Sequence, residues 1–169
     1  WGSLTVTPAA KQEQIDHLKA ELTSESLVNA NLSNGRALFN QTCSNCHRLF
    51  NAGKNLAPDL TGGNRMNLDY LLENIVTPSA LVPNQYKVTT FVLDSGRVIN
   101  GVIKSETDQT LTVQTEKDEI TLAREEIEVS KPSNLSLMPD GVLDKMSPEQ
   151  IRDLIGYLQS DRQIEVVGE

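Results

Sequence analysis

The chain has 169 residues, of which 38% are hydrophobic and only 4% aromatic, and its formal net charge is −8. This length suits one domain or one domain with a sizeable insertion. The negative charge argues against general affinity for nucleic acid or anionic lipid, and it favours small molecules or basic protein surfaces as partners. No apolar run approaches the length of a membrane span. No signal-peptide pattern is present, but the sequence starts at Trp1, so this carries little information about the compartment.

The first part of the sequence has a helical pattern. Thr7 and Pro8 are typical of a helix start, and apolar residues then recur at helical spacing to about Leu27. The pattern predicts a linker helix that packs on another element. Two further helices are expected over residues 34–41 and 67–76, with a loop rich in Gly, Asn and Pro between them.

The period of the apolar residues changes to two over residues 86–130, which are rich in Val, Ile and Thr. This pattern predicts five short antiparallel strands in a small barrel or a curled sheet. Gly101 in the middle of a strand predicts a sharp bend, and Pro132 is expected to end the β block. The candidate turns are Asp94-Ser95-Gly96, Thr107-Asp108-Gln109 and Lys117-Asp118.

The last predicted helix starts at Ser147, with Pro148 in its first position and Gln150 completing a capping box. It needs the earlier helices to pack on, so the β block between them is an insertion. The expected fold class is mainly α with an inserted antiparallel barrel or curled sheet (α+β). The expected parts are a linker helix at 1–30, a discontinuous helical domain at 31–83 and 132–162, the β subdomain at 84–131, and a tail at 163–169.

Cys43, Cys46 and His47 form the pattern C-x-x-C-H, which is the attachment signature of c-type haem. The two thiols add to the two vinyl groups of the porphyrin, and the histidine becomes the proximal iron ligand. A disulfide would close a very small loop and stabilise little. Two cysteines exclude a Cys-only zinc site, and a dithiol redox pair usually follows a strand rather than a helix. The motif therefore predicts one covalent haem c per chain.

The surroundings of this motif resemble a class I cytochrome c. Residues 35–39 resemble that family's N-terminal helix, in which a glycine and an aromatic residue meet the C-terminal helix, and residues 151–158 resemble that partner helix. Residues 57–60 resemble the G-P-x-L loop, with Ala57 in place of the usual glycine. The resemblance implies that the carbonyl of Pro58 accepts a hydrogen bond from His47 and so orients the ring.

Residues 31–160 resemble more closely the haem-binding domain at the C-terminal end of many large secreted planctomycete and verrucomicrobial proteins. The β insertion is part of that family's definition. The domain often follows a dehydrogenase-like β-propeller, which implies a fused dehydrogenase domain or a redox protein as partner and a periplasmic or otherwise extracytoplasmic location. The matching segments are NGRALF, CSNCHRLF, APDLTGGNR, YLLENIVTPSALV, DSGRVINGVIKSET and SLMPDGVLDKMSPEQIRDLIGYL.

Three methionines are candidates for the sixth iron ligand. Met66 and Met146 each precede a helix start and can act as hydrophobic staples. Met138 precedes a proline in an irregular loop, where class I cytochromes carry their distal methionine, so Met138 is the predicted ligand opposite His47. The other histidine, His17, is a poor candidate, and an open sixth site is the more serious alternative.

Other residues near the predicted site have a structural alternative. Arg65 is expected to pair with a haem propionate, or else to be a solvated loop arginine. Tyr70 and Tyr86 are candidate propionate donors, although tyrosine is more often a core-edge residue. The β insertion is expected to cover one edge of the haem, with docking of a redox partner as the alternative.

The predicted function is therefore electron transfer without a substrate of its own, so the chain is expected to be a carrier rather than an enzyme. Two alternatives stay open at this point. One is a haem enzyme or gas sensor with an open sixth site, and the other is a binding module in which haem is structural. Neither nucleic-acid binding nor membrane insertion is expected, and the sequence does not determine the oligomeric state.

Overall fold

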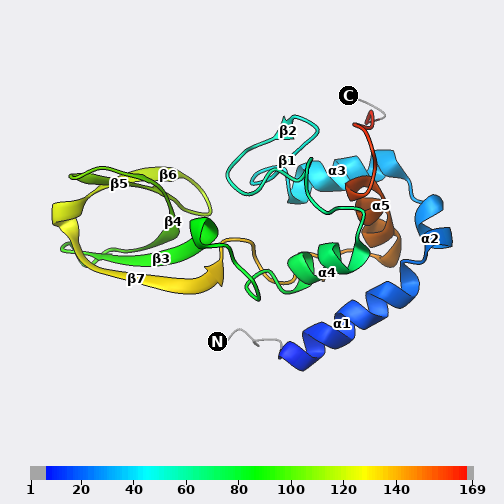
Figure 1. Cartoon of the computed structure of the whole chain (residues 1–169), viewed down its shortest axis with the longest axis horizontal. Helices are drawn as coiled ribbons and strands as arrows, with labels where there is room; N and C mark the ends of the chain where they lie inside the picture. The colour runs from blue at the N-terminus through cyan, green and yellow to red at the C-terminus, as the bar shows by residue number, and fades with distance from the viewer. Residues whose placement is uncertain (1–6, 167–169) are drawn as a thin grey trace. The chain divides into compact units, whose positions relative to one another are not determined.

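The computed structural model describes residues 7–166. The chain divides into two compact units, Trp1–Thr77 with Asp140–Glu169, and Pro78–Pro139. Helices make up most of the first unit and a five-stranded antiparallel sheet makes up most of the second, so the secondary structure is α+β (Figure 1). The sequence placed the limits of the insertion at 84 and 131, inside these unit boundaries. None of the helices among the described residues is both long and apolar enough to cross a membrane.

The first unit combines five α-helices with one very short β ladder. Helix α1 packs against α4, and α3 packs against α5. The helices are α1 (Pro8–Glu21), α2 (Ser24–Val28), α3 (Leu32–Thr42), α4 (Leu68–Val76) and α5 (Pro148–Leu158), and the ladder pairs β1 (Arg48–Leu49) with β2 (Ala52–Gly53).

The N-terminal helix is shorter than the apolar spacing predicts. Thr7 caps α1 as expected, but the helix ends at Glu21, and Leu22 leaves the helical region with φ −86° and ψ 54°. The hydroxyl of Thr23 then accepts a hydrogen bond from the backbone of Ser26 and starts α2. The prediction of one continuous helix to about Leu27 is therefore wrong, because Thr23 caps a second helix.

Helices α3 and α5 approach each other closely at Gly35. A Cβ atom at Gly35 would lie 2.0 Å from the backbone oxygen of Asp153 and 2.7 Å from Cβ of Tyr157. The rings of Phe39 and Tyr157 meet edge to face with centroids 5.7 Å apart, and neither residue is exposed to solvent. The glycine and aromatic contact expected between the first and last helices of the domain is therefore present.

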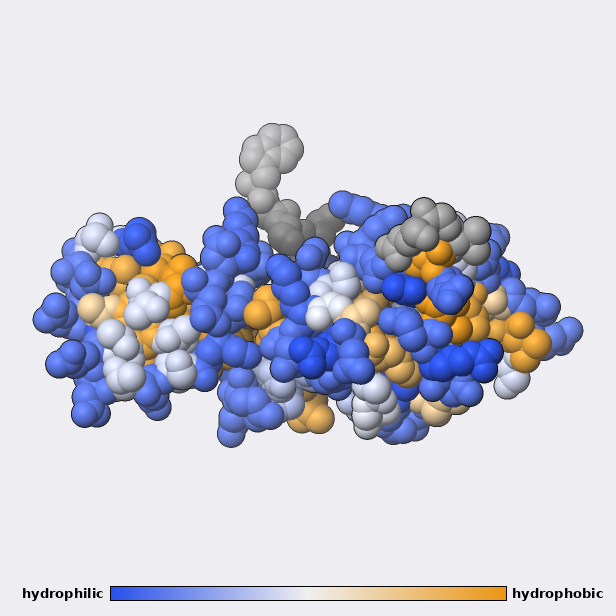
Figure 2. Space-filling view, turned by 90° about the horizontal axis from the view of Figure 1, so that it is seen from above, coloured by the Kyte–Doolittle hydropathy of each residue, from blue (hydrophilic) through white to orange (hydrophobic). Residues whose placement is uncertain are grey.

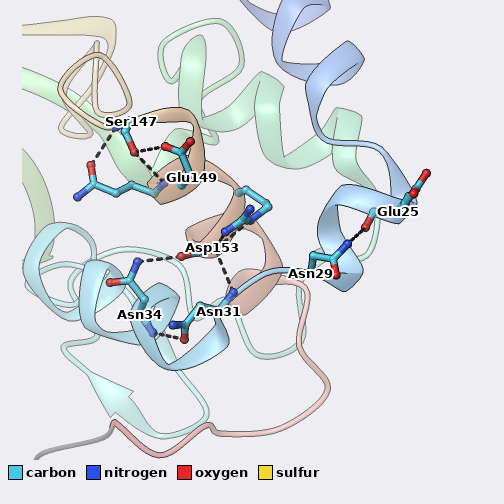
Figure 3. A network of polar contacts seen from close by, with 9 residues as sticks. Glu25, Asn29, Asn31, Asn34, Ser147, Glu149 and Asp153 are labelled. Carbon is cyan, nitrogen blue, oxygen red and sulfur yellow. Dashed lines mark hydrogen bonds and ion pairs between the residues drawn. The ribbon is translucent and has the colours of Figure 1, made fainter.

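A buried carboxylate ties the start of α3 to α5 (Figure 3). Asp153 is only 4% exposed, and it accepts hydrogen bonds from the backbone of Asn31 at 3.0 Å and from the side chain of Asn34 at 2.9 Å. Arg152 also pairs with it at 2.7 Å. The charge is acceptable inside the protein because these donors surround it. The expected capping box of Ser147 and Gln150 is also present at the start of α5.

The second unit is an antiparallel sheet with the strand order β6-β5-β4-β3-β7. No pairing between β6 and β7 closes it among the described residues, so its strand pairing is that of an open sheet. Phe91, Val113 and Leu122 lie at the centre of its core. The strands are β3 (Lys87–Leu93), β4 (Val98–Glu106), β5 (Thr110–Gln114), β6 (Glu119–Ala123) and β7 (Ile127–Ser136), with the 3-10 turns η1 (Asn84–Tyr86) and η2 (Arg124–Glu126).

Strand β4 changes its pairing partner at Gly101, where the sequence predicts a bend. Residues up to Gly101 pair with β3, and residues from Val102 onward pair with β5. A Cβ atom at Gly101 would lie 2.4 Å from a side-chain carbon of Val113, so only glycine fits there. The alternation of buried and exposed side chains along β4 shifts at Gly101. Val98 is 59% exposed and Ile99 is buried before it, and Val102 is buried just after it.

On the surface drawn in Figure 2, hydrophobic residues are exposed among hydrophilic ones.

Pro132 lies inside β7, where it pairs with Thr89, and β7 continues to Ser136. The expectation that Pro132 ends the β block is therefore wrong. Strand β7 is an edge strand, and an edge position accepts proline because one side of the strand needs no N–H donor.

We predict that Gly35→Ala lowers the free energy of unfolding by about 1–3 kcal/mol, because the added methyl group has to push α3 and α5 apart. Urea unfolding followed by circular dichroism measures the change. Gly62→Ala is the matched control, since nothing lies within 4 Å of a Cβ atom at Gly62. Equal loss of stability in both variants would contradict this account of the crossing.

Asp153 gives a second prediction. Burial alone would raise the pKa of Asp153, but its bonds to Asn34, Arg152 and Asn31 outweigh burial and hold the pKa below its usual value. As pH falls, the carboxylate of Asp153 therefore becomes protonated at a higher pH in the unfolded chain than in the folded chain. The contribution of Asp153 to the free energy of unfolding is complete above about pH 4. It is lost as pH falls through the folded-state pKa of this residue.

We therefore expect Asp153→Asn to lose about 2 kcal/mol at neutral pH and to show a flatter fall of stability with acid. Urea midpoints between neutral and acid pH test this, with the exposed Asp161→Asn as the control. If the stability of Asp153→Asn falls with acid as steeply as that of the unchanged chain, Asp153 is not the group responsible.

Candidate functional site

The C-x-x-C-H segment is a turn that continues directly from α3. Cys43 is the C-cap of α3, and its N–H donates to the carbonyl of Phe39. The N–H groups of Cys46 and His47 both donate to the carbonyl of Cys43, at 3.0 and 2.9 Å. The two cysteines and the histidine are therefore placed by one compact turn whose orientation follows that of α3.

The segment after the hairpin wraps back over this turn. The N–H groups of Leu56 and Ala57 both donate to the carbonyl of Cys46, at 3.0 and 2.9 Å. Gly53 has a φ of +95°, and a Cβ atom there would lie 2.3 Å from the carbonyl oxygen of His47. Backbone hydrogen bonds and one close glycine contact thus hold the loop against the motif.

The ring of His47 is half-buried, and its Nδ1 atom lies 2.8 Å from the carbonyl oxygen of Pro58. A carbonyl can only accept, so Nδ1 carries the hydrogen. Burial lowers the pKa of His47, and the bond to Pro58 opposes this shift without reversing it. The neutral ring therefore keeps a free lone pair on Nε2, which is the form that binds a metal.

Both cysteines are free thiols; Cys43 is half-buried and Cys46 is exposed. Burial, with a smaller contribution from neighbouring Cys46, raises the pKa of Cys43 to about 12. A reactive dithiol pair needs a thiolate stabilised near neutral pH, and the environment of Cys43 does the opposite. Cys43 is therefore poorly suited to act as the attacking thiolate in thiol–disulfide exchange.

The sequence interpretation missed the hairpin after the motif. Phe50 and Asn51 form the turn between β1 and β2, with φ values of +49° and +64°. Two positive φ values in a two-residue turn are typical of a type I′ hairpin. Asn51 is a usual residue for such a turn, but Phe50 is not. The sequence therefore carries only one of the two residues that would indicate this hairpin.

Arg65 is half-buried, and its guanidinium group lies on backbone carbonyls of the first unit. It donates to Leu158 at 2.5 Å, to Ser160 at 2.9 Å and to Thr61 at 3.2 Å. Its charge also lies 5.0 Å from the centre of the Phe50 ring. It is thus not the solvated loop arginine given as the alternative, and pairing with a propionate stays a prediction.

The other predicted residues are spread over the chain. Met66 is 72% exposed, which does not fit a hydrophobic staple, whereas Met146 is half-buried and lines a hollow beside α1. Met138 is half-buried in the second unit, where its N–H donates to the hydroxyl of Ser136 at 3.1 Å. His17 lies on the surface of α1, 3.7 Å from the carboxylate of Glu21.

The two tyrosines named as propionate donors lie in different units. Tyr70 lies in α4 and is 43% exposed, and Tyr86 ends η1 in the second unit. In residues 7–166, no group of three or more His, Cys, Asp or Glu side chains is arranged to hold a metal ion. For His47, the carbonyl of Pro58 orients the ring for metal binding.

The geometry around the motif fits a covalently held haem. The described hydrogen bond of His47 leaves Nε2 free, and Cys43, Cys46 and His47 lie on one compact turn. The Nε atoms of Arg48 and Arg65 are buried without a hydrogen-bond partner among the described residues, and such donors suit an anionic group. When bound, haem c supplies an iron centre that exchanges single electrons.

A family model described as Cytochrome C oxidase, cbb3-type, subunit III matches residues 30–88. The match includes α3, the C-x-x-C-H turn, the loop of Pro58 and α4, and it excludes α5 and Met138. Together with the geometry of the turn, it supports a c-type cytochrome domain with haem c and a role in electron transfer. Such domains are typically extracytoplasmic. A comparison with curated proteins finds no match for the chain.

The thiols give a prediction for the haem-free chain. We expect iodoacetamide at neutral pH to modify the exposed Cys46 and to leave Cys43 largely unmodified, because a thiol with a pKa of about 12 has almost no thiolate at that pH. Both cysteines lie on the tryptic peptide 37–48, so fragmentation of that peptide in the mass spectrometer measures each site. Denaturant is expected to remove the difference, and equal rates in the folded chain would contradict the burial of Cys43.

Proposed function

We propose that the chain is an electron-transfer domain in which haem c is attached through Cys43 and Cys46 and is ligated by His47 and Met138. The observation that carries the proposal is the 2.8 Å contact between Nδ1 of His47 and the carbonyl of Pro58. A carbonyl that accepts from Nδ1 fixes the tautomer and makes Nε2 a stronger donor to iron. A turn with an idle histidine has no need of that contact.

Met138 is the proposed sixth ligand because the other two methionines suit the position less well. Met66 is largely exposed, and Met146 packs beside α1. Met138 directly precedes Pro139, after which the chain re-enters the first unit at Asp140. A thioether opposite histidine gives a raised reduction potential and a filled coordination sphere, as an electron carrier requires.

The proposed partner is a fused dehydrogenase domain or a separate redox protein with a basic surface. The net charge of −8 supports a basic partner, and the resemblance to the planctomycete and verrucomicrobial haem-binding domain supports the dehydrogenase. The matched family is named as a subunit of an oxidase, and a carrier role is proposed here on the oriented histidine of the C-x-x-C-H turn. The proposed location is the periplasm or another extracytoplasmic compartment.

The test is a visible spectrum of the haem-loaded chain, oxidised and reduced. We expect covalent haem that stays with the denatured protein, and sharp low-spin bands after reduction. Cys43→Ser with Cys46→Ser is expected to lose the covalent link. A loaded protein with high-spin bands and rapid carbon monoxide binding would replace electron transfer by an open-site enzyme or sensor.

The sixth ligand is tested by Met138→Ala in the loaded protein. We expect a shift toward high-spin bands and a lower reduction potential, because the iron loses its thioether. Met66→Ala and Met146→Leu are the matched controls and are expected to leave the spectrum unchanged. If Met138→Ala keeps the unchanged spectrum, the sixth ligand is a different group.

A further inference from the structure

Arg65 connects three parts of the first unit that are far apart in sequence. One Nη atom donates to the carbonyls of Leu158 and Ser160, and the other donates to the carbonyl of Thr61. The ring of Phe50 lies under the same guanidinium group. A single side chain thus holds the end of α5, the loop after the motif and the β1–β2 turn together.

The acceptors explain why arginine suits this position. The last carbonyls of a helix have no partner within the helix and carry the negative end of its dipole. The carbonyl of Leu158 is such a group, and that of Ser160 follows it just after the helix. The planar guanidinium can serve several acceptors at fixed angles, whereas a lysine ammonium is a mobile point charge.

The loop that Arg65 contacts at Thr61 also contains Pro58, whose carbonyl orients the ring of His47. The hydroxyl of Thr61 accepts from the N–H of Phe50 at 2.9 Å, and the N–H of Thr61 donates to the carboxylate of Asp59 at 2.8 Å. Asp59 follows Pro58, whose carbonyl meets His47. The loop is therefore tied at one end to His47 and at the other to Arg65.

We infer that Arg65 is a positioning residue for His47. It holds residues 58–61 against the end of α5, so that the carbonyl of Pro58 stays within hydrogen-bond range of Nδ1. The effect on the iron rests on the proposed function, but the effect on the loop does not. This role differs from direct pairing with a haem propionate, in which the positive charge rather than the carbonyl contacts would matter.

The first measurement uses the haem-free chain and amide hydrogen exchange. Arg65→Lys keeps the charge and loses the shared carbonyl contacts, so the N–H groups of Ala57, Leu60 and Thr61 are expected to exchange at least about tenfold faster. Arg36→Lys is the matched control, because Arg36 also donates to a C-terminal backbone carbonyl, that of Ile164, but from α3. Unchanged loop exchange in Arg65→Lys would overturn the inference.

Slow exchange within α5 shows that the variant is folded. If Arg65→Lys does not fold, Phe50→Leu removes only the ring beneath the guanidinium and is expected to speed exchange at the same loop amides by a smaller factor. Loop exchange that stays unchanged in Phe50→Leu would then overturn the inference.

The second measurement is the reduction potential of the loaded protein. A looser bond to Pro58 makes His47 a weaker donor to the oxidised iron, so Arg65→Lys is expected to raise the potential. Pairing with a propionate predicts no change for Arg65→Lys and a lower potential for Arg65→Gln, because only the second removes a positive charge. An unchanged potential in Arg65→Lys together with a lower potential in Arg65→Gln would overturn the inference. If haem does not attach at all, the proposed function fails while the exchange measurement still tests the clamp.

Discussion

The close crossing of α3 and α5 is the constraint on which the rest of the first unit depends. Gly35 leaves no room for a side chain between the helices, and Asp153 fixes their relative register through Asn31 and Asn34. Helix α3 runs into Cys43, and the end of α5 supplies the carbonyls that hold Arg65. One helix contact thus sets the position of the motif and of the loop that faces it.

Features with a local chemical cause were predictable from the sequence. Ser147 and Gln150 indicate a capping box because their side chains satisfy each other's backbone donors, and the structure has it. Pro58 was expected to face His47 only through a resemblance, yet the contact is present. The ligand role of Met138 stays a prediction, because it depends on iron and on how two units meet.

Features that depend on distant parts of the chain could not be predicted in the same way. Phe50 adopts a positive φ that its own chemistry disfavours, and its partner Arg65 lies in a later loop. The partners of Arg65 come from the other end of the chain, where α5 ends. The prediction that Pro132 ends the β block is wrong because a proline is tolerated within an edge strand. That β7 is an edge strand is a property of the assembled sheet and cannot be seen in the local sequence.

The burial of Cys43 also imposes an order in time. In the unfolded chain its thiol has an ordinary pKa of about 8.5, and it is open to enzymes and reagents. Once α3 is packed and the loop has closed over the turn, the same sulfur is withdrawn and its thiolate is suppressed. Reagents that need the thiolate of Cys43 are therefore expected to reach it more readily before folding than after it.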